Sequence, residues 1–181
     1  MTTILGVSGS LRAGSYNTSL LRASVALLPS QAVMMPFLGL GDLPLFNPDL
    51  DAITEPEPVA LWRRALGAAD GVIIFTPEYA HGVPGALKNA LDWVVGSGEL
   101  VDKPTALVSA STSLDGGHHA HAALRRTLTV MSARMIEGTS LCIPTVRAKL
   151  DANCQLIDAA TQAELRGVLQ SLVAACRAAP I

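Results

Sequence analysis

One segment of the chain, Gly71–Phe75, restricts the possible folds more than any other. It is a run of apolar residues with no polar alternation, as expected for a strand that is buried on both faces. Such strands belong to parallel sheets that carry helices on both sides. Because parallel strands must be joined by crossover connections, the sequence predicts an open α/β sheet.

Short apolar runs and helical apolar stripes alternate along the whole chain, which we expect to form one domain over residues 1–181. The Gly-, Pro- and Asp-rich passage Leu38–Ile53 has turn chemistry and little periodicity, so we expect a loop there. Thr161 and Glu164 fit a capping box at the start of the last helix. The expected strands are Thr3–Val7, Ala32–Phe37, Gly71–Phe75, Thr105–Ser109 and Met135–Ile143. The expected helix faces are Leu21, Val25 and Leu28; Val59, Trp62 and Leu66; Leu87, Ala90, Leu91 and Val94; Leu124, Leu128 and Met131; and Leu165, Val168, Leu169, Leu172, Val173 and Cys176.

The composition limits the partners of the chain. Its formal charge of -2 provides no basic field for holding nucleic acid, so nucleic acid is not an expected partner. Only 15% of the residues are charged, which leaves neutral or apolar side chains on the surface and favours a homodimer or homotetramer. The longest uncharged run, Ala23–Gly41, is interrupted by prolines, and the first residues lack the cationic start of a secretory signal. We therefore expect a cytoplasmic protein with no membrane partner.

A polar loop follows the first expected strand. Ser8–Ser19 reads Ser-Gly-Ser-Leu-Arg-Ala-Gly-Ser-Tyr-Asn-Thr-Ser and stands at the entrance of a helix. Free N–H groups and the positive end of the helix dipole favour an anion at such a place. Arg12 can hold two phosphate oxygens, so the loop predicts a phosphate site; the alternative is an ordinary helix cap beside a solvated arginine. The side chains that can donate to the remaining oxygens are Ser10, Ser15, Asn17 and Thr18.

The spacing of the glycines argues against two common types of nucleotide-binding loop. A nucleoside-triphosphate loop requires Lys and then Ser or Thr after its second glycine, whereas Gly14 is followed by Ser15 and Tyr16. The dinucleotide pattern Gly-x-Gly-x-x-Gly is not matched by Gly6, Gly9 and Gly14. A monophosphate therefore fits the loop best.

A second loop, Phe75–Gly85, follows the buried third strand. Two prolines restrain its backbone, and Tyr79 can present its ring face to a flat ligand, although a rim tyrosine with a hydrogen-bonded hydroxyl is the alternative. Together the two loops resemble the NADPH-dependent FMN reductase family, which includes flavin, quinone, azo-dye and chromate reductases. The resemblance spans about Thr3 to Met131 and rests on the segments Gly9–Asn17, Pro77–Tyr79 and Pro84–Trp93.

The resemblance implies a flavodoxin-like three-layer sandwich, in which a five-stranded parallel sheet carries helices on both faces. It also implies FMN as cofactor and NADPH as co-substrate, with hydride passing through FMN to a small-molecule electron acceptor (a flavin, a quinone, an azo compound or a metal oxyanion). The first loop would hold the FMN phosphate, and the second loop and Ser109–Ser111 would border the ring or the ribityl chain. The cofactor-binding residues that follow are Ser10, Arg12, Ser15, Tyr16, Asn17, Thr18, Pro77, Glu78, Tyr79, Ala80, His81 and Ser111.

The chain departs from the family pattern at one position of the second loop. Many members carry Asn after the Pro-Glu-Tyr triplet, whereas this chain has Ala80 and then His81. A polar contact at the pyrimidine edge of the flavin is then either missing or supplied by His81 or by backbone N–H groups. Glu78 is expected to be structural, with its carboxylate bonding backbone N–H groups that shape the loop. Trp93 is expected to pack, either in its own chain or against a second chain.

Two groups of potential metal ligands do not form a metal site. His118 and His119 are adjacent and point to different faces of a helix, and no nearby carboxylate or cysteine completes a tetrahedral set. We interpret Gly116–His121 as a solvated helix start whose two glycines give backbone clearance near the cofactor. The cysteines form no Cys-x-x-Cys pair and are expected to be inert, buried thiols: Cys142, Cys154 and Cys176.

No Ser-His-Asp or Cys-His constellation stands out, so we expect the cofactor to carry the redox chemistry and no side chain to be catalytic. A different class, the flavodoxin-type electron carrier, would bind FMN for a protein partner without oxidising NADPH. Such carriers are usually strongly acidic, whereas the charge here is only -2, which favours the enzyme. A nucleotide-binding module without flavin is a third possibility.

Overall fold

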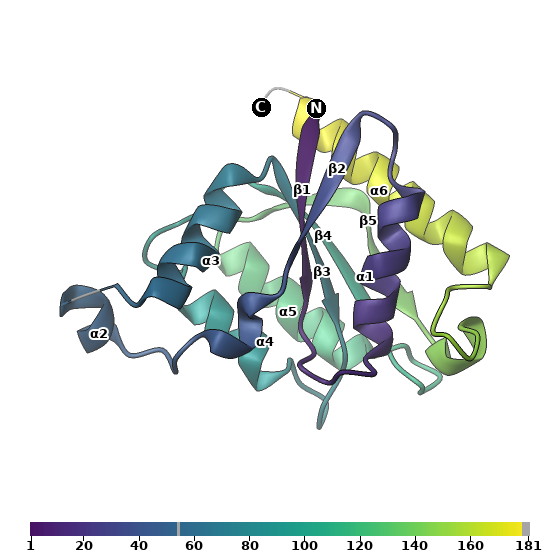
Figure 1. Ribbon diagram of the computed structural model, residues 1–181, viewed down its shortest axis with the longest axis horizontal. Helices are drawn as coiled ribbons and strands as arrows, with labels where there is room; N and C mark the ends of the chain where they lie inside the picture. Colours follow the sequence, from purple (N-terminus) through teal and green to yellow (C-terminus); the bar gives the residue numbers. More distant parts are fainter. Residues whose placement is uncertain (54, 179–181) are drawn as a thin grey trace.

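The computed structural model describes residues 1–53 and 55–178, in which five strands form a parallel sheet in the order β2-β1-β3-β4-β5 (Figure 1). The strands are β1 (Thr2–Ser8), β2 (Ala32–Phe37), β3 (Gly71–Thr76), β4 (Pro104–Ala110) and β5 (Arg134–Ile143). The α-helices are α1 (Tyr16–Leu27), α2 (Pro48–Ile53), α3 (Glu57–Ala68), α4 (Gly85–Asp92), α5 (His118–Val130) and α6 (Ala159–Arg177), and two short 3-10 helices are η1 (Gly39–Asp42) and η2 (Val146–Lys149). The predicted parallel α/β sheet is thereby confirmed.

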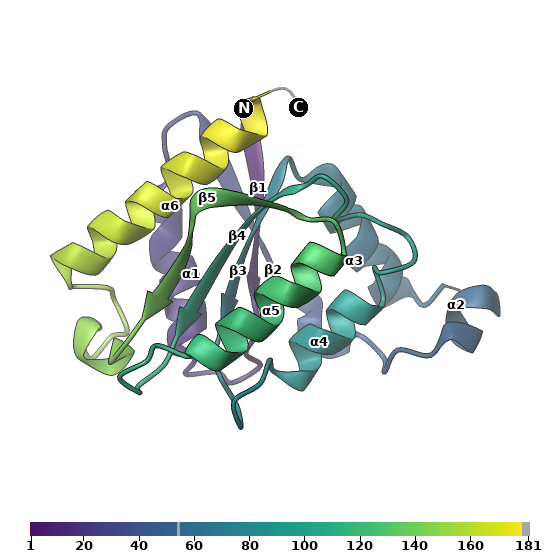
Figure 2. The same cartoon turned by 180° about the vertical axis from the view of Figure 1, so that it is seen from behind.

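Both faces of the sheet are covered, as the apolar sequence of β3 requires. Successive side chains of a strand point to opposite faces, so Ile74 packs with α3, α4 and α5 while Ile73 and Phe75 pack with α1 and α6. Figures 1 and 2 show the same division, with α1 and α6 on one side of the sheet and α3, α4 and α5 on the other. Every residue of β3 and β4 is buried, which fixes these two strands at the centre of the core.

The strand order places the loops after β1 and β3 side by side at the carboxyl ends of the strands. From β1 the chain first crosses to β2 on one side and later returns to β3 on the other side. The loops that leave β1 and β3 therefore diverge at their carboxyl ends, where open α/β sheets bind their ligands. The loop after β4 lies next to them along the same edge, at the bottom of the view in Figure 1.

The passage Leu38–Ile53 is not the plain loop that its composition predicts, because it contains η1 and α2. Asn47 caps α2: its side-chain oxygen accepts the N–H of Asp49 at 2.9 Å, and its carbonyl accepts the N–H of Leu50 at 3.0 Å. Pro48 stands at the first helical position, where its missing N–H costs no hydrogen bond. Asn47-Pro48 is thus a helix start, which the turn-forming residues around it obscure.

Two details of the other helices also differ from expectation. In α1, Val25 is exposed and Ser24 takes its place on the buried face, where its hydroxyl donates to the carbonyl of Leu20 at 2.8 Å. In α6, the capping residue is Asp158 rather than Thr161, because the Asp158 carboxylate accepts both the N–H and the hydroxyl of Thr161, at 2.8 and 2.7 Å. Ser24 is hard to predict because it is a polar residue on an apolar stripe. Asp158 is hard to predict as the cap because Thr161 is a second possible cap nearby.

Trp93 is fully buried within its own chain, which excludes the alternative of a second chain covering it. Its Nε1 donates to the carbonyl of Pro44 at 2.8 Å, and the ring of Phe46 meets it edge-on at 5.1 Å between centroids.

Among the described residues, no helix combines the length and the apolar character needed to cross a membrane.

Candidate functional site

The loops after β1, β3 and β4 surround a small cleft at the carboxyl edge of the sheet. Its volume is about 120 Å³, below the roughly 300–1,000 Å³ of pockets that enclose drug-sized ligands, so it holds only part of a larger ligand. Most of the residues predicted for the site meet here. The lining residues are Ser10, Arg12, Ser15, Tyr16, Asn17, Pro77, Glu78, Tyr79, Ala110, Ser111 and Thr112.

The first loop ends at the N-terminus of α1. Ser15 is the N-cap residue, and its hydroxyl accepts the N–H of Thr18 at 3.4 Å. The remaining first-turn N–H groups have no acceptor inside the helix, which makes this end of α1 an electropositive wall of the cleft. Arg12 is exposed, and its guanidinium carbon stands 5.7 Å from the centre of the Tyr16 ring. The loop therefore provides an exposed cation and fixed N–H donors, which is the chemistry of a phosphate site.

Asn17 is buried at the bottom of the cleft, with 2% of its surface exposed. Its Nδ2 donates to the carbonyl of Ala110 at 3.0 Å, which ties α1 to the end of β4. Since a carbonyl only accepts hydrogen bonds, this contact also fixes the orientation of the amide. The other amide atom, Oδ1, is buried and has no partner among the described residues. An unpartnered buried acceptor is costly, so the site fits a ligand that brings a hydroxyl or N–H donor as well as a phosphate.

The second loop closes the cleft from the β3 side. Tyr79 is 54% exposed, and its hydroxyl lies 3.5 Å from that of Ser10, at the limit of a hydrogen bond. This contact joins the two loops that the sequence singles out. The phenol hydroxyl points to the polar cleft, and the ring offers an apolar face at the rim.

Glu78 connects the second loop to α5. One carboxylate oxygen, Oε2, accepts the N–H of Ala120 in the first turn of α5 at 2.8 Å, and the other, Oε1, lies 3.2 Å from Nδ1 of His81. Glu78 thus bonds a backbone N–H group, as the sequence predicts, although this group belongs to α5 rather than to its own loop. A negative side chain at a helix N-terminus also stabilises the helix dipole.

The third loop is fastened to β5. The N–H of Ser111 donates to the carbonyl of Ile143 at 3.2 Å, and the carbonyl of Ser111 accepts the N–H of Val146 at 3.0 Å. Thr112 also lines the cleft and is a residue that the sequence interpretation missed, although it follows Ser111 directly at the end of β4.

The twin glycines bring the start of α5 close to the second loop. Gly116 and Gly117 have positive φ values of 66° and 81°, which a residue with a side chain rarely adopts. A Cβ added to Gly117 would lie 3.4 Å from the Cβ of Glu78. Asp115 accepts hydrogen bonds from the Ser113 hydroxyl and from the N–H of Gly117, and these two bonds lower its pKa. The two glycines therefore give backbone clearance, as expected, and the side chain of Glu78 lies in the space beside Gly117.

Three of the predicted residues lie beside the cleft rather than in its lining. Thr18 shares a hydrogen bond of 2.8 Å with the hydroxyl of Ser8. Ala80 and His81 form the exposed tip of the second loop.

The histidine-rich start of α5 is only partly solvated, contrary to expectation. His118 and His119 are exposed, but His121 is buried between β4 and β5. Its Nδ1 lies 3.2 Å from the hydroxyl of Ser109, and its Nε2 lies 2.7 Å from that of Ser140. Burial lowers the pKa of His121 to about 4. The sequence carried a signal for this, because His121 precedes Leu124 by three residues and continues the apolar stripe of α5.

Neither the histidines nor the cysteines form a metal centre in the part of the chain that the structure describes, where no three His, Cys, Asp or Glu side chains are grouped to hold an ion. The cysteines are free, but they are half-buried rather than buried as expected: Cys142, Cys154 and Cys176. Burial raises the pKa of the Cys176 thiol to about 11, which keeps it unreactive.

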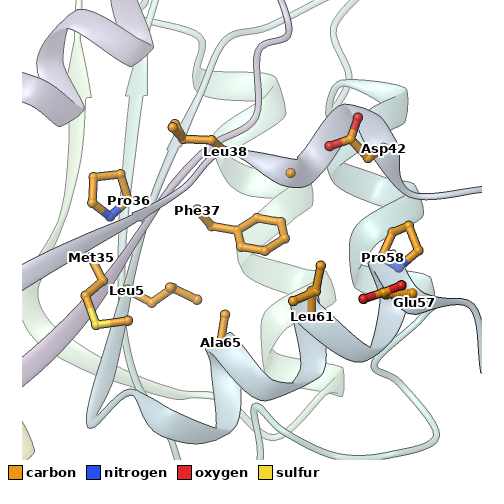
Figure 3. A pocket seen from close by; sticks show the side chains of 11 residues that line it. Leu5, Met35, Pro36, Phe37, Leu38, Asp42, Glu57, Pro58, Leu61 and Ala65 are labelled. Carbon is orange, nitrogen blue, oxygen red and sulfur yellow. The ribbon is translucent and has the colours of Figure 1, made fainter.

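A larger cavity of about 630 Å³ lies elsewhere, between the edge strand β2 and helix α3 (Figure 3). Figure 3 shows Met35, Phe37 and Leu61 around an apolar interior, with the carboxylates of Asp42 and Glu57 at one end. Its acidic end would repel a phosphate, and its polar groups do not converge on one point. The small polar cleft is therefore the better candidate site.

Known proteins are similar to this chain in sequence and in fold. The sequence model of the NADPH-dependent FMN reductase family matches residues 2–147. An NAD(P)H-dependent FMN reductase of Pseudomonas aeruginosa is 33% identical over 171 residues, which cover 93% of this chain and 92% of that protein. A quinone reductase of Pseudomonas putida is 40% identical over 155 residues, 84% of this chain and 83% of that protein.

Among solved structures, the flavoenzyme NAD(P)H:(acceptor) oxidoreductase FerB of Paracoccus denitrificans superposes with a TM-score of 0.87 at 28% identity, over 97% of both chains. The fold is thus the expected flavodoxin-like sandwich. The match of the family model to most of the chain, together with the relatives above 30% identity, leads to one conclusion: this chain belongs to the NADPH-dependent FMN reductase family.

Proposed function

We propose that this chain is an NAD(P)H-dependent oxidoreductase that holds FMN at the cleft and passes hydride from NADPH through FMN to a small quinone-type acceptor. The observation that carries the proposal is the convergence of three loops on one cleft, where Ser10 meets Tyr79 and Asn17 meets Ala110. Family membership supports the cofactor. The names of the relatives, FMN reductase and quinone reductase, support the nucleotide and the acceptor class.

Each loop has a separate task in this proposal. The N-terminus of α1, with Ser10, Arg12 and Ser15, holds the phosphate through N–H, hydroxyl and guanidinium donors. Asn17 receives a ribityl hydroxyl at its unpartnered Oδ1. Because the cleft has room for only part of the cofactor, Pro77–Tyr79 at the rim would border the ring and leave it within reach of a nucleotide or an acceptor.

When bound, FMN supplies the hydride chemistry, and the protein supplies binding, orientation and the local field. The open rim also admits other oxidants, so planar flavins and azo compounds and the smaller metal oxyanions are further candidate acceptors. No side chain is required to form a covalent bond to the substrate.

The electron-carrier alternative is not favoured. Steered docking to a protein partner requires a strong surface field, and the formal charge of the chain is only -2. The family model and the relatives point to enzymes that oxidise the nicotinamide nucleotide themselves.

The test is an anaerobic titration of the FMN-loaded protein with NADPH, and with NADH in a parallel sample. We expect NADPH alone to bleach the flavin absorbance and benzoquinone to restore it. Bleaching that needs an added reductase would support the electron carrier instead. Failure of the purified protein to retain FMN would overturn the proposal as a whole.

We also propose that the protein is a cytoplasmic homodimer or homotetramer. Large apolar side chains are exposed on the segment between β2 and α3, among them Leu38, Leu45 and Ile53, and only 15% of all residues are charged. Light scattering behind a sizing column would give the mass directly, and a monomer at micromolar concentration would contradict this assignment.

A further inference from the structure

The tip of the second loop has an unusual backbone. Tyr79 and Gly82 pair as in an antiparallel hairpin: the N–H of Tyr79 donates to the carbonyl of Gly82 at 3.2 Å, and the reverse bond measures 2.9 Å. The two residues between them, Ala80 and His81, both have positive φ values, 49° and 57°. Two-residue hairpins with two positive φ values normally contain Asn-Gly or Gly-Gly, because a Cβ is unfavourable there. His81 is thus held in a strained conformation beside the cleft, and strain at such a place points to a role for the side chain.

The imidazole of His81 is fixed by two contacts. Its Nδ1 lies 3.2 Å from Oε1 of Glu78, and its ring meets the ring of His119 edge-on, with 4.4 Å between centroids. Glu78 cannot turn away freely, because its other oxygen accepts the N–H of Ala120. A carboxylate only accepts hydrogen bonds, so Nδ1 carries the proton and Nε2 is the nitrogen that remains available.

This histidine does not serve the core. Its side chain is 76% exposed, whereas that of Glu78 is 11% exposed, so a shielded carboxylate orients a solvent-accessible imidazole. His119 of α5 faces the imidazole, and two further titratable groups, His118 and Asp115, interact with His119. The arrangement of carboxylate, imidazole and open site is that of a general acid with its orienting partner.

We propose that His81 is the general acid that protonates a quinone-type acceptor and that Glu78 is its positioning residue; this inference rests on the proposed function. Reduction of a quinone to a hydroquinone takes up one hydride and one proton. The hydride brings both electrons from the nicotinamide nucleotide by way of FMN. The proton comes from the imidazolium of His81: its Nε2–H bond breaks, a new O–H bond forms on the acceptor, and the electron pair stays on Nε2. A proton from the solvent then binds Nε2 and restores the imidazolium before the next turnover, so each turnover consumes one solvent proton.

The test compares two acceptors with the FMN-loaded His81→Asn protein. Asparagine tolerates positive φ, so this variant keeps the hairpin while removing the imidazole. We expect turnover with benzoquinone near pH 7 to fall about 100-fold, the low end of the usual effect of a general acid. Turnover with ferricyanide, which takes one electron and no proton, is expected to be unchanged, as is bleaching by NADPH. His118→Gln is the matched control, since His118 is also exposed and contacts His119, and it should behave as the wild type with both acceptors.

A second readout does not depend on turnover. Nitrogen NMR of the imidazoles in the wild type should show neutral His81 with its proton on Nδ1, and Glu78→Gln should shift the population toward the Nε2 form. A wild-type rate and pH profile of the His81→Asn variant with benzoquinone would overturn the inference and leave the proposed function intact, as would a proton on Nε2 in the wild type. A wild type that is bleached by NADPH and never reoxidised by benzoquinone would overturn both the acceptor class and the inference.

Discussion

Replacing Asn17 with alanine separates the structural task of this residue from its proposed task toward the cofactor. Asn17→Ala removes the 3.0 Å bond from Nδ2 to the carbonyl of Ala110 and leaves that carbonyl buried without its donor. An unsatisfied buried group costs about 1–3 kcal/mol. The substitution also removes the unpartnered Oδ1, which offsets part of this cost in the cofactor-free protein. We therefore expect a loss of about 1 kcal/mol in the free energy of unfolding, at the low end of the range for an unsatisfied group, and a fall of roughly 2–4 °C in Tm.

The effect on the cofactor is independent of this loss. If Oδ1 accepts a ribityl hydroxyl, Asn17→Ala removes one hydrogen bond of about 0.5–1.5 kcal/mol from the complex. The Kd for FMN then rises roughly 2- to 13-fold. Urea unfolding of the cofactor-free protein measures the stability, and quenching of FMN fluorescence during titration measures the Kd.

The matched control is Ser24→Ala, which removes another buried side-chain bond of α1, 2.8 Å from the hydroxyl to the carbonyl of Leu20, about two helical turns beyond Asn17 and outside the lining of the cleft. It should leave the Kd for FMN unchanged. An unaltered FMN affinity in Asn17→Ala, together with the expected loss of stability, would refute the assignment of Oδ1 to the ligand.

Three further substitutions test the packing around the cleft. Ala80→Gly, at φ 49°, should raise the free energy of unfolding by about 0.5–1 kcal/mol, since relief of the strain exceeds the entropy that glycine loses; a loss in urea unfolding would contradict the strain argument. Gly117→Ala, at φ 81°, should lower the free energy of unfolding by about 1–2 kcal/mol and weaken FMN binding, because the backbone strain falls on a segment in contact with Glu78; an unchanged urea midpoint would argue against it. The pKa of His121, lowered to about 4 by burial, means that the unfolded chain binds its proton first, so the wild type should lose stability as the pH falls from 6.5 towards 4. His121→Gln should remove this part of the pH dependence. A wild type that loses no more stability between pH 7 and pH 5 than His121→Gln does, as measured by urea unfolding, would disprove the assignment.

The sheet could be predicted from the sequence because its information is local. The apolar run at Gly71–Phe75 can bury both of its faces only at the centre of a parallel sheet. The Ser/Gly-rich loop and the Pro-Glu-Tyr loop then leave neighbouring strands at the same end of the sheet. Their meeting at Ser10 and Tyr79 follows from topology alone.

What could not be predicted depends on contacts between distant residues. His121 reads as part of a polar, histidine-rich helix start, and only the hydroxyls of Ser109 and Ser140 make its burial acceptable. The positive φ values at Ala80 and His81 contradict local preference, so no propensity argument leads to them. The helix cap at Asp158 was hidden because Thr161, three residues later, offers an equally good local signal.

The central claim is that the N-terminus of α1 and the loop around Arg12 bind a phosphate that carries the redox ring to the Pro-Glu-Tyr hairpin. The most direct measurement is a fluorescence titration of the cofactor-free protein with FMN and, separately, with riboflavin, which has the same ring and ribityl chain but no phosphate. A single charge-assisted hydrogen bond contributes about 1.5–3 kcal/mol, or roughly 10- to 100-fold in affinity. We expect one FMN per chain and a Kd for riboflavin at least about 10-fold higher than that for FMN. Equal affinities for the two flavins would contradict the account.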